Sequence, residues 1–441
     1  MRDAWKPVRS LLRSIHERPL LYYGLLVPLS IALYDQHGRL AVGIPPIVPI
    51  TGLFLLLGIA QGGADRIRLT WQASPGAFWL YGLVCAAELL LGFYHASPSG
   101  WLFVAGRVTF LVVLVTVVAN FGSRTDAEDA LTGLTIGASI IGLLTLVQAS
   151  RVVQLPFAAP VWPGRYFGSF QLPFPRTLGI DMSRDKYGIA AAVALPTLIA
   201  SSRAPRRLLG SRWLRIVLFS LVTIGTAITQ SRGAYLTVLL ALGLTLTLVL
   251  GTKVFNRSLF RDRGALLIAL GYAALLVVAN VAFTAVAPEW FVGVETSIDH
   301  QNVYVRSDVN AQGWLQFQEA PLLGVGHGAR FASGRANAAI HNHFLEQMVS
   351  TGLVGGVPYL LFHLWILVSA LQLLGGWRQS QLVVPISLLV SVAATYLAYQ
   401  FFPGFFTSVF AVVCGLVLAV VRQERRLPEA TGNASGTPST G

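Results

Sequence analysis

Long apolar runs separated by short polar segments dominate the pattern of hydrophobic and polar positions along this chain. A helix that crosses the roughly 30 Å hydrocarbon core of a bilayer needs about 20 mostly apolar residues. About twelve runs approach or meet that length, so the pattern predicts an all-α polytopic membrane protein with about 12 transmembrane helices. The predicted runs are 20–34, 40–60, 77–95, 101–120, 130–149, 187–201, 214–230, 234–251, 265–286, 343–373, 382–399 and 405–421.

Basic residues are distributed unevenly between the loops that join these runs. If the N-terminus is cytoplasmic, the loops on that side hold about two thirds of the 32 basic residues, among them Arg66, Arg124 and Arg422. Short loops rich in Lys and Arg remain on the cytoplasmic side of a membrane. The charge pattern therefore predicts that both termini are cytoplasmic.

Two longer segments then fall on the outer side of the membrane, at about residues 150–186 and 287–342. The second lies between predicted spans 9 and 10 and contains an amphipathic stretch, 303–319, which predicts a helix on the membrane surface. The turn-rich residues 321–328 follow it, and we expect a flexible turn there. Residues 1–426 are interpreted as a single transmembrane helical domain, and residues 427–441, rich in Gly, Ser, Thr and Pro, as a disordered cytoplasmic tail.

Composition supports the membrane interpretation and narrows the possible functions. The chain is 54% hydrophobic and 12% charged, with a mean hydropathy of +0.64, whereas soluble domains carry roughly 25% charged residues. The net charge of +13 does not indicate nucleic-acid binding, because the basic residues lie in short loops and not among aromatics on a polar domain. Cys85 and Cys414 both lie inside apolar runs and far apart in the sequence, so we expect neither a disulfide framework nor thiol chemistry.

Arginines on the predicted outer face are exceptions to the charge bias. Arg232 lies in the very short connection 230–233 between two predicted spans, and an arginine near membrane depth is costly unless it is paired or functional. It could snorkel to lipid phosphates. It could equally clamp a diphosphate, for which the planar fork of guanidinium donors is well suited.

Two histidines, His341 and His343, open the apolar run that follows the second outer segment. Asn342 between them is a suitable N-cap, which would leave His341 at the positive end of the helix dipole. That end disfavours the imidazolium, and a neutral histidine can accept a proton as a general base. Taken alone, a polar histidine at a helix start is more often structural than catalytic.

Other chemistries find less support in the sequence. On a helix the side chains of His341 and His343 would diverge by about 200°, and no third zinc ligand is evident. No Asp-x-Asp pair is present to hold a divalent metal, and the glycines at 324, 326 and 328 lack the flanking strand and helix of a nucleotide-binding motif. No nucleophile elbow marks a Ser-His-Asp triad. We therefore predict no metal and no cofactor.

Three motifs then resemble those of a known family, the O-antigen ligases and the superfamily they share with O-antigen polymerases. His341-Asn342 followed, after nine residues, by Gly352-Leu-Val-Gly355 resembles the ligase signature. Ser231-Arg232-Gly233-Ala234 resembles the Ser-Arg-Gly element of the superfamily, and Arg306 with Trp314 and the block 319–326 resembles a further conserved block. Order and spacing agree from about residue 187 to the last span, whereas the N-terminal half matches only as a hydrophobic pattern.

This resemblance implies a glycosyltransferase similar to the GT-C-type membrane enzymes, in the bacterial inner membrane with its active site on the periplasmic side. It would transfer a glycan from an undecaprenyl-diphosphate carrier to lipid A-core oligosaccharide, among membrane lipids and without a metal. The residue chemistry fits: His341 would deprotonate the acceptor hydroxyl, and Arg232 and Arg306 would neutralise the departing diphosphate. Further substrate contacts are predicted at Arg176, Arg184, Lys186, Asn342 and His343.

Three alternatives remain open. An O-antigen polymerase would use the same donor but a second carrier-linked glycan as acceptor, and a protein-glycosylating ligase would accept a protein. A lipid-linked sugar transporter or flippase belongs to a different class. It predicts charges buried near the bilayer midplane and an internal repeat, and we expect neither, because the unusual charges gather at one face.

Overall fold

A computed structural model of the protein describes most of the chain as helix. It describes residues 6–37, 46–95, 98–150, 161–162, 166–167, 170–171, 176–177, 184–202, 209–229, 231–251, 264–276, 278, 298–327, 331–333, 336–338, 340, 342–376, 382–400 and 408–432. The helices before the first outer segment are α1 (Lys6–Glu17), α2 (Pro19–His37), α3 (Ile47–Ala60), α4 (Gly63–Ala73), α5 (Pro75–His95), α6 (Pro98–Asn120) and α7 (Arg124–Ala149). Those after it are α8 (Arg184–Ser201), α9 (Arg212–Thr229), α10 (Arg232–Gly251), the helix Gly264–Leu276, α12 (Ile298–Glu319), α13 (His343–Gly376), α14 (Val383–Tyr399) and α15 (Ser408–Gly432).

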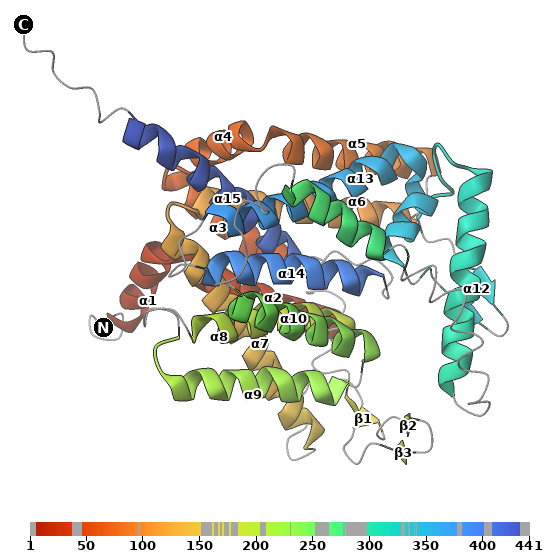
Figure 1. Ribbon diagram of the computed structural model, residues 1–441, viewed down its shortest axis with the longest axis horizontal. Helices are drawn as coiled ribbons and strands as arrows, with labels where there is room; N and C mark the ends of the chain where they lie inside the picture. Colours follow the sequence, from red (N-terminus) through yellow and green to blue (C-terminus); the bar gives the residue numbers. More distant parts are fainter. Residues whose placement is uncertain are drawn as a thin grey trace, which may run out of the picture.

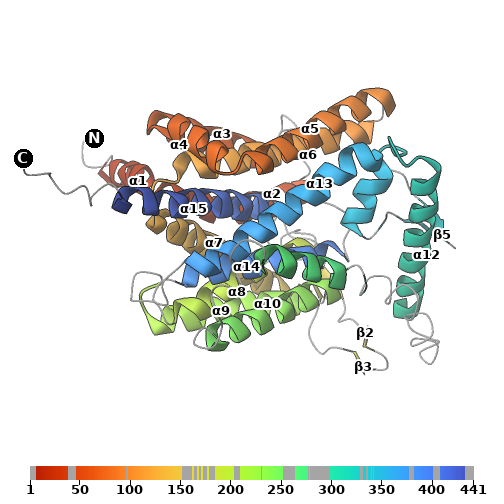
Figure 2. The same ribbon diagram turned by 45° about the horizontal axis from the view of Figure 1, so that its top comes forward.

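The long helices lie side by side in one bundle, and α1 and the last turns of α15 lie at the same end of it (Figure 1). At the opposite end α12 lies crosswise to the bundle helices, as Figures 1 and 2 both show. We call these two ends the terminal end and the α12 end. A helix is therefore present where the amphipathic stretch 303–319 predicted one, and it covers one end of the bundle.

Six helices in the described residues are long and apolar enough to cross a membrane, or seven if α3 and α4, which are bent by 94° at a short break, form one span. The other apolar helices are shorter: Pro19–Ser30, Tyr187–Ser201, Gly264–Leu276 and Val383–Tyr399. The multi-pass helical architecture is thus confirmed in its coarse form. The count of twelve spans and the cytoplasmic placement of the termini stay predictions.

Three short strand pairs interrupt the otherwise helical description. Strand β1 (Val161–Trp162) pairs antiparallel with β4 (Arg176–Thr177), and β2 (Tyr166–Phe167) pairs with β3 (Phe170–Gln171). In the second outer segment β5 (Phe331–Ser333) pairs with β6 (Ala336–Ala338). All of them lie in the two segments predicted to be outside the membrane, where backbone groups need no helical pairing.

Small residues allow the closest helix contact, between α2 and α7. A Cβ atom on Gly133 would lie 2.1 Å from the carbonyl oxygen of Leu21, and one on Gly24 would lie 2.5 Å from the carbonyl oxygen of Ala130. Only glycine permits this approach of the two backbones, as is common between helices in membranes. Helix α14 is buried along nearly its whole length, so it lies in the centre of the bundle.

Arginines at the terminal end donate hydrogen bonds to backbone carbonyls, most of them at helix ends. Arg422 donates to the carbonyl oxygens of Phe121 (2.8 Å) and Arg66 (2.9 Å), and the side chain of Arg66 donates to those of Ala119 (3.0 Å) and Gln61 (3.1 Å). Cations are favoured at helix C-termini, where the carbonyls of Phe121, Ala119 and Gln61 lie. Several basic residues that predicted the topology therefore also stabilise the helix ends.

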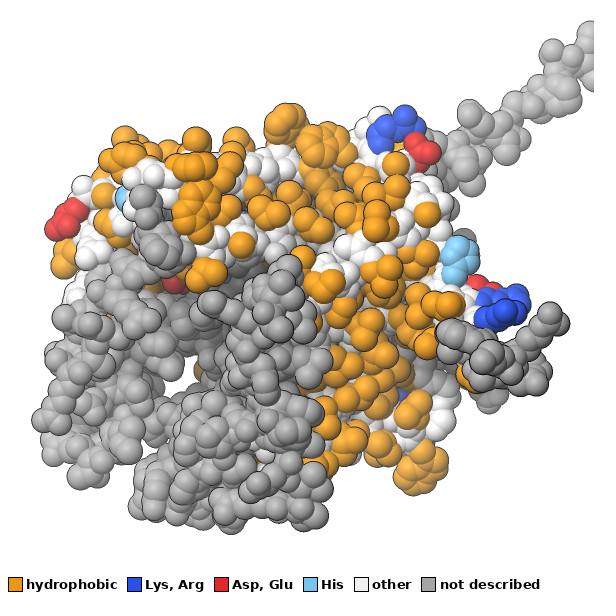
Figure 3. Space-filling model, turned by 180° about the vertical axis from the view of Figure 1, so that it is seen from behind, with side chains coloured by type: hydrophobic (Ala, Val, Ile, Leu, Met, Phe, Trp, Pro, Cys, Tyr) orange, Lys and Arg blue, Asp and Glu red, His pale blue; other side chains and the backbone are white. Residues whose placement is uncertain are grey.

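The described surface of the bundle is largely hydrophobic on the face shown in Figure 3, and the Lys and Arg side chains visible on it gather towards the terminal end. Large exposed apolar side chains include Leu53, Leu90, Phe93 and Leu239. Such a surface is expected of a protein whose surroundings are lipid.

Candidate active site

The α12 end contains the start of α13, where the sequence placed a histidine pair. The Asn342 side-chain oxygen accepts a hydrogen bond from the backbone N–H of Leu345 (3.0 Å), so the predicted N-cap is confirmed. The Asn342 amide also donates to the Gln400 side chain at the end of α14 (3.0 Å). Asn342 therefore caps the N-terminal end of α13.

Helix α13 is broken at Gly352, which has φ 59° and ψ −156°, a conformation essentially restricted to glycine. In a continuous helix, Leu353 and Val354 would donate to the carbonyls of Val349 and Ser350. Leu353 instead donates to Pro321 (2.8 Å) and Val354 to Leu322 (3.2 Å).

The carbonyls freed by this break are bound by the same stretch of chain. Val325 donates to the oxygen of Val349 (2.9 Å) and Gly326 to that of Ser350 (3.0 Å). Residues 320–327, which we call the inserted loop, thus replace the missing helical hydrogen bonds. Gly324, Gly326 and His327 are buried. The expected turn is therefore present, and it packs inside the helix break.

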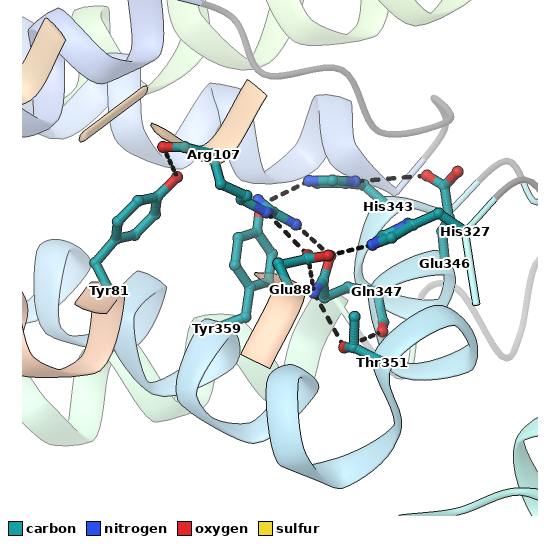
Figure 4. A network of polar contacts seen from close by, with 9 residues as sticks. All are labelled: Tyr81, Glu88, Arg107, His327, His343, Glu346, Gln347, Thr351 and Tyr359. Carbon is teal, nitrogen blue, oxygen red and sulfur yellow. Dashed lines mark hydrogen bonds and ion pairs between the residues drawn. The ribbon is translucent and has the colours of Figure 1, made fainter. Parts of the chain in front are cut away.

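A buried polar network surrounds the end of the inserted loop (Figure 4). Glu88 on α5 accepts hydrogen bonds from Arg107 on α6 (Nε to Oε1, 3.2 Å) and from Gln347 on α13 (Nε2 to Oε1, 2.8 Å). The other carboxylate oxygen is bonded to Nε2 of His327. Arg107 also donates to the Gln347 side chain, so the four polar groups pair with one another in a region that excludes water.

Aromatic groups complete the surroundings of the network. The Arg107 guanidinium lies 4.3 Å from the centre of the Tyr359 ring, close enough for a cation–π interaction. The His327 ring stacks on Phe103 at 3.9 Å with a 9° angle between the planes. His343 is buried and pairs through Nε2 with the Tyr359 hydroxyl (2.6 Å).

The structure describes only some of the predicted site residues. His341 lies outside the described residues. Arg232 is the first residue of α10, Arg184 the first of α8 and Arg306 lies on α12. Lys186 also lies on α8, and Arg176 begins β4. The side chains of these five basic residues lie outside the described part, whereas those of Asn342 and His343 are described and bonded to other protein groups.

Contacts between the helices nevertheless place the ends of several of these elements at one level. A Cβ on Gly188 would lie 2.7 Å from the Cα of Ala234, so the first turns of α8 and α10 pack together. Ser391 contacts the carbonyl of Ala192 (3.5 Å), and Gln400, further along α14, reaches Asn342. The N-terminal ends of α8, α10 and α13 therefore lie near the C-terminal end of α14.

Helix α12 joins this arrangement through the residue that precedes His341. A Cβ on Gly313 would lie 2.8 Å from Cδ1 of Ile340, so α12 packs directly on Ile340. Val309 and Phe317 of the same helix share a small hydrophobic cluster with Ile340 and Val349. The start of α13 is thus fixed by α12 on one side and by the bundle on the other.

The sequence analysis did not identify Glu88 and Arg107 as site residues, and its expectation that no charges are buried near the bilayer midplane stays a prediction. Both side chains are fully buried. Glu88 lies about 10 Å from the end of α5 at a rise of about 1.5 Å per residue, within the half of the bundle nearer the α12 end. A signal was present: each is the sole Asp, Glu, Lys or Arg of its apolar run, 77–95 and 101–120, and such residues mark functional sites by default.

The described residues contain no group of three or more His, Cys, Asp or Glu side chains arranged to hold a metal ion. The positive ends of three helix dipoles, α8, α10 and α13, lie at the α12 end, and each favours an anion. The arrangement is chemically suited to a negatively charged group approaching from that end.

Residues 216–360 match a family model described as O-antigen ligase. This match supports the resemblance of the chain to the O-antigen ligase superfamily. No curated protein matches it. The superfamily comprises glycosyltransferase-like ligases and polymerases of the membrane that act on lipid-linked glycans.

The match to the O-antigen ligase family extends from α9 into α13, past the break at Gly352. It therefore includes Arg232, Arg306, His341 and the inserted loop. Glu88 and Arg107 lie outside it, on α5 and α6. The network thus joins the matched region to the N-terminal half of the chain, which the sequence matched only as a hydrophobic pattern.

Proposed function

We propose that this protein is an O-antigen ligase. It transfers O-antigen polysaccharide from undecaprenyl diphosphate to lipid A-core oligosaccharide, at the periplasmic face of the bacterial inner membrane, and so completes lipopolysaccharide. The α12 end is then the periplasmic end and both termini are cytoplasmic. The positions of Arg66 and Arg422 at the terminal end support this orientation, because basic residues favour the cytoplasmic side.

The observation that carries the proposal is the convergence of matched elements at the α12 end. Arg232 begins α10, and His341 directly precedes the Asn342 that caps α13. Asn342 reaches Gln400 of α14, which packs beside α8 and α10. The starts of two separate stretches of the matched region, α10 and α13, therefore lie at one level, as a site for a single diphosphate-linked substrate requires.

The proposed reaction is a single displacement. His341 takes the proton from an acceptor sugar hydroxyl, and the resulting oxygen attacks the anomeric carbon of the donor. The bond between that carbon and the diphosphate oxygen breaks, and undecaprenyl diphosphate leaves with the bonding electron pair. Configuration at the anomeric carbon is inverted, and no glycosyl-enzyme intermediate forms.

The leaving group requires positive charge, since negative charge grows on the diphosphate as the bond breaks. Arg232 and Arg306 supply it in this proposal, in place of a metal ion. Arg184 and Lys186 on α8 and Arg176 on β4 provide further phosphate contacts. Asn342 and His343 are proposed to border the substrate, Asn342 through the helix start that it caps.

Two related activities use the same donor. An O-antigen polymerase accepts a second carrier-linked glycan, and a protein-glycosylating ligase accepts a protein. The spacing of His341-Asn342 to Gly352 and Gly355 favours lipid A-core as acceptor. A transporter is disfavoured because the buried charges Glu88 and Arg107 are paired with each other and enclosed by protein.

Reconstitution with competing acceptors tests this proposal directly. Purified protein in lipid nanodiscs receives a carrier-linked glycan together with equal amounts of lipid A-core and of a second carrier-linked glycan. A ligase attaches the glycan to lipid A-core. Elongated carrier-linked glycan as the main product would instead identify a polymerase, and an unchanged donor would contradict glycan transfer.

A further inference from the structure

We propose that Glu88 and His327 are positioning residues for glycan transfer. The Glu88 carboxylate ties the inserted loop to residues 343–351, the first segment of α13, and thereby sets the place of His341 at its start. The inference rests on the proposed function and adds to it residues on α5 and in the inserted loop that the family motifs do not contain.

The first segment of α13 needs an external support because of the break at Gly352. A continuous helix would fix its own start through the hydrogen bonds of each successive turn. Here Leu353 and Val354 donate to the inserted loop instead. The position of the first segment is therefore set by what holds it from outside.

Glu88 contacts both parts that must be held together. Its Oε1 accepts from Gln347 of the first segment (2.8 Å), and its Oε2 is bonded to His327 of the inserted loop. One carboxylate thus joins two stretches of chain, each more than two hundred residues away in the sequence.

Arg107 extends this tie across the break. Its guanidinium bonds to Gln347 before Gly352 and lies over the ring of Tyr359 beyond it. It also supplies the counter-charge that a carboxylate buried among apolar helices needs. The network therefore holds the two parts of α13 against α5 and α6.

Burial decides that these residues position and do not touch the substrate. The side chains of Glu88 and Arg107 are 0% exposed and that of His327 is 4% exposed. A polysaccharide donor could not reach them. Any effect of these residues on the rate of glycan transfer must then pass through the start of α13. Gln347, which bonds to Glu88 and Arg107, lies about one helical turn from that start.

Two substitutions at His327 separate positioning from packing. His327→Phe keeps a ring to stack on Phe103 but removes the N–H that Glu88 accepts. His327→Gln keeps an N–H donor. Glu88 keeps its ion pair with Arg107 and its hydrogen bond from Gln347 in both variants, so no buried charge is left without a partner. Both variants are compared with wild type in nanodiscs, with kcat and KM for the carrier-linked donor measured together with hydrogen exchange.

We expect His327→Phe to lower kcat by about tenfold or more and to leave KM within about twofold, since misplacement of a catalytic group acts on the transition state. His327→Gln should recover most of kcat. Exchange should rise in peptides covering 343–351 of the Phe variant and stay unchanged in peptides covering 359–374. Unchanged kcat in His327→Phe, or equal losses in both variants, would overturn the proposal.

The two proposals can fail separately. If wild-type protein transfers no glycan, the proposed function is wrong. The role of Glu88 and His327 in holding α13 is then tested by hydrogen exchange of His327→Phe alone. A rise in exchange confined to residues 343–351 supports that role, and no rise overturns it. If His327→Phe does not fold, Gln347→Met removes the same tie from the α13 side at similar volume. The same kcat, KM and exchange criteria then apply to that variant.

Discussion

The backbone nitrogen of Leu353 lies 2.8 Å from the carbonyl oxygen of Pro321 and donates its hydrogen bond there, not within its own helix. This bond and its three neighbours fill the break in α13 with the inserted loop. The loop carries His327 to Glu88, and the segment before the break carries Asn342 and the residue preceding it. The motif blocks of the O-antigen ligase superfamily are thereby brought into direct contact.

Gly352 should tolerate no side chain. Its φ of 59° and ψ of −156° are unfavourable for other residues, and a Cβ would lie 2.3 Å from the carbonyl oxygen of Leu322. We expect Gly352→Ala to destabilise the protein by at least about 2 kcal/mol. Thermal unfolding in detergent, followed by size-exclusion chromatography, measures this. Gly82→Ala is the control, because a Cβ there meets nothing within 4 Å; equal melting of the two variants would contradict the account.

Gly313 should couple α12 to the active site through Ile340. A Cβ at position 313 presses on Cδ1 of Ile340 at 2.8 Å, a flexible side-chain end that can shift. We expect Gly313→Ala to lower the rate of glycan transfer by about tenfold with little loss of stability, since small misplacements of reacting groups are costly. Adding Ile340→Val, which shortens the side chain, should recover part of the rate. An unchanged transfer rate in Gly313→Ala, or no recovery of the rate on adding Ile340→Val, would show that this contact does not affect the active site.

Asn342 should stabilise α13 through its side-chain oxygen. Loss of an N-cap costs about 1 kcal/mol, so Asn342→Ala should lower the melting temperature, whereas Asn342→Ser retains an oxygen for the N–H of Leu345. Gln400→Ala removes only the second hydrogen-bond partner of Asn342. Its melting temperature therefore gives the contribution of that hydrogen bond separately from the cap. Identical melting of wild type and Asn342→Ala would argue against the cap.

The sequence predicted much of the fold, because membrane helices follow from apolar length alone. At least part of each predicted apolar run is helical in the described residues, and α12 and the Asn342 cap lie where the local pattern placed them. Such features depend on residues close together in the chain.

The inserted loop and the buried polar network could not be predicted, because they depend on contacts between residues far apart in the sequence. In the sequence, the glycine at 352 and the turn at 321–327 are each ordinary local features. Only the hydrogen bonds between them in the folded protein show that the turn fills the break in α13. Glu88 pairs with His327 and Gln347 across sequence separations of 239 and 259 residues. No local pattern specifies such a pairing, although a lone acid in one apolar run and a lone arginine in the next could have drawn attention to it.

Removal of metal ions should leave the enzyme active. Arginines stabilise the leaving diphosphate in the proposed mechanism, so purified protein should transfer glycan at an unchanged rate in excess chelator. The assay compares initial rates with and without chelator after dialysis. A loss of activity that added divalent metal restores would count against the proposed role of Arg232 and Arg306.

The central claim is that His341 is the general base of glycan transfer at the α12 end. The most direct test measures transfer from carrier-linked glycan to lipid A-core by His341→Ala in nanodiscs, beside wild type and beside His16→Ala, a control on α1 at the opposite end of the bundle. The account predicts that His341→Ala folds and inserts normally and transfers no glycan, while His16→Ala stays active. Wild-type rates of transfer by folded His341→Ala would contradict it.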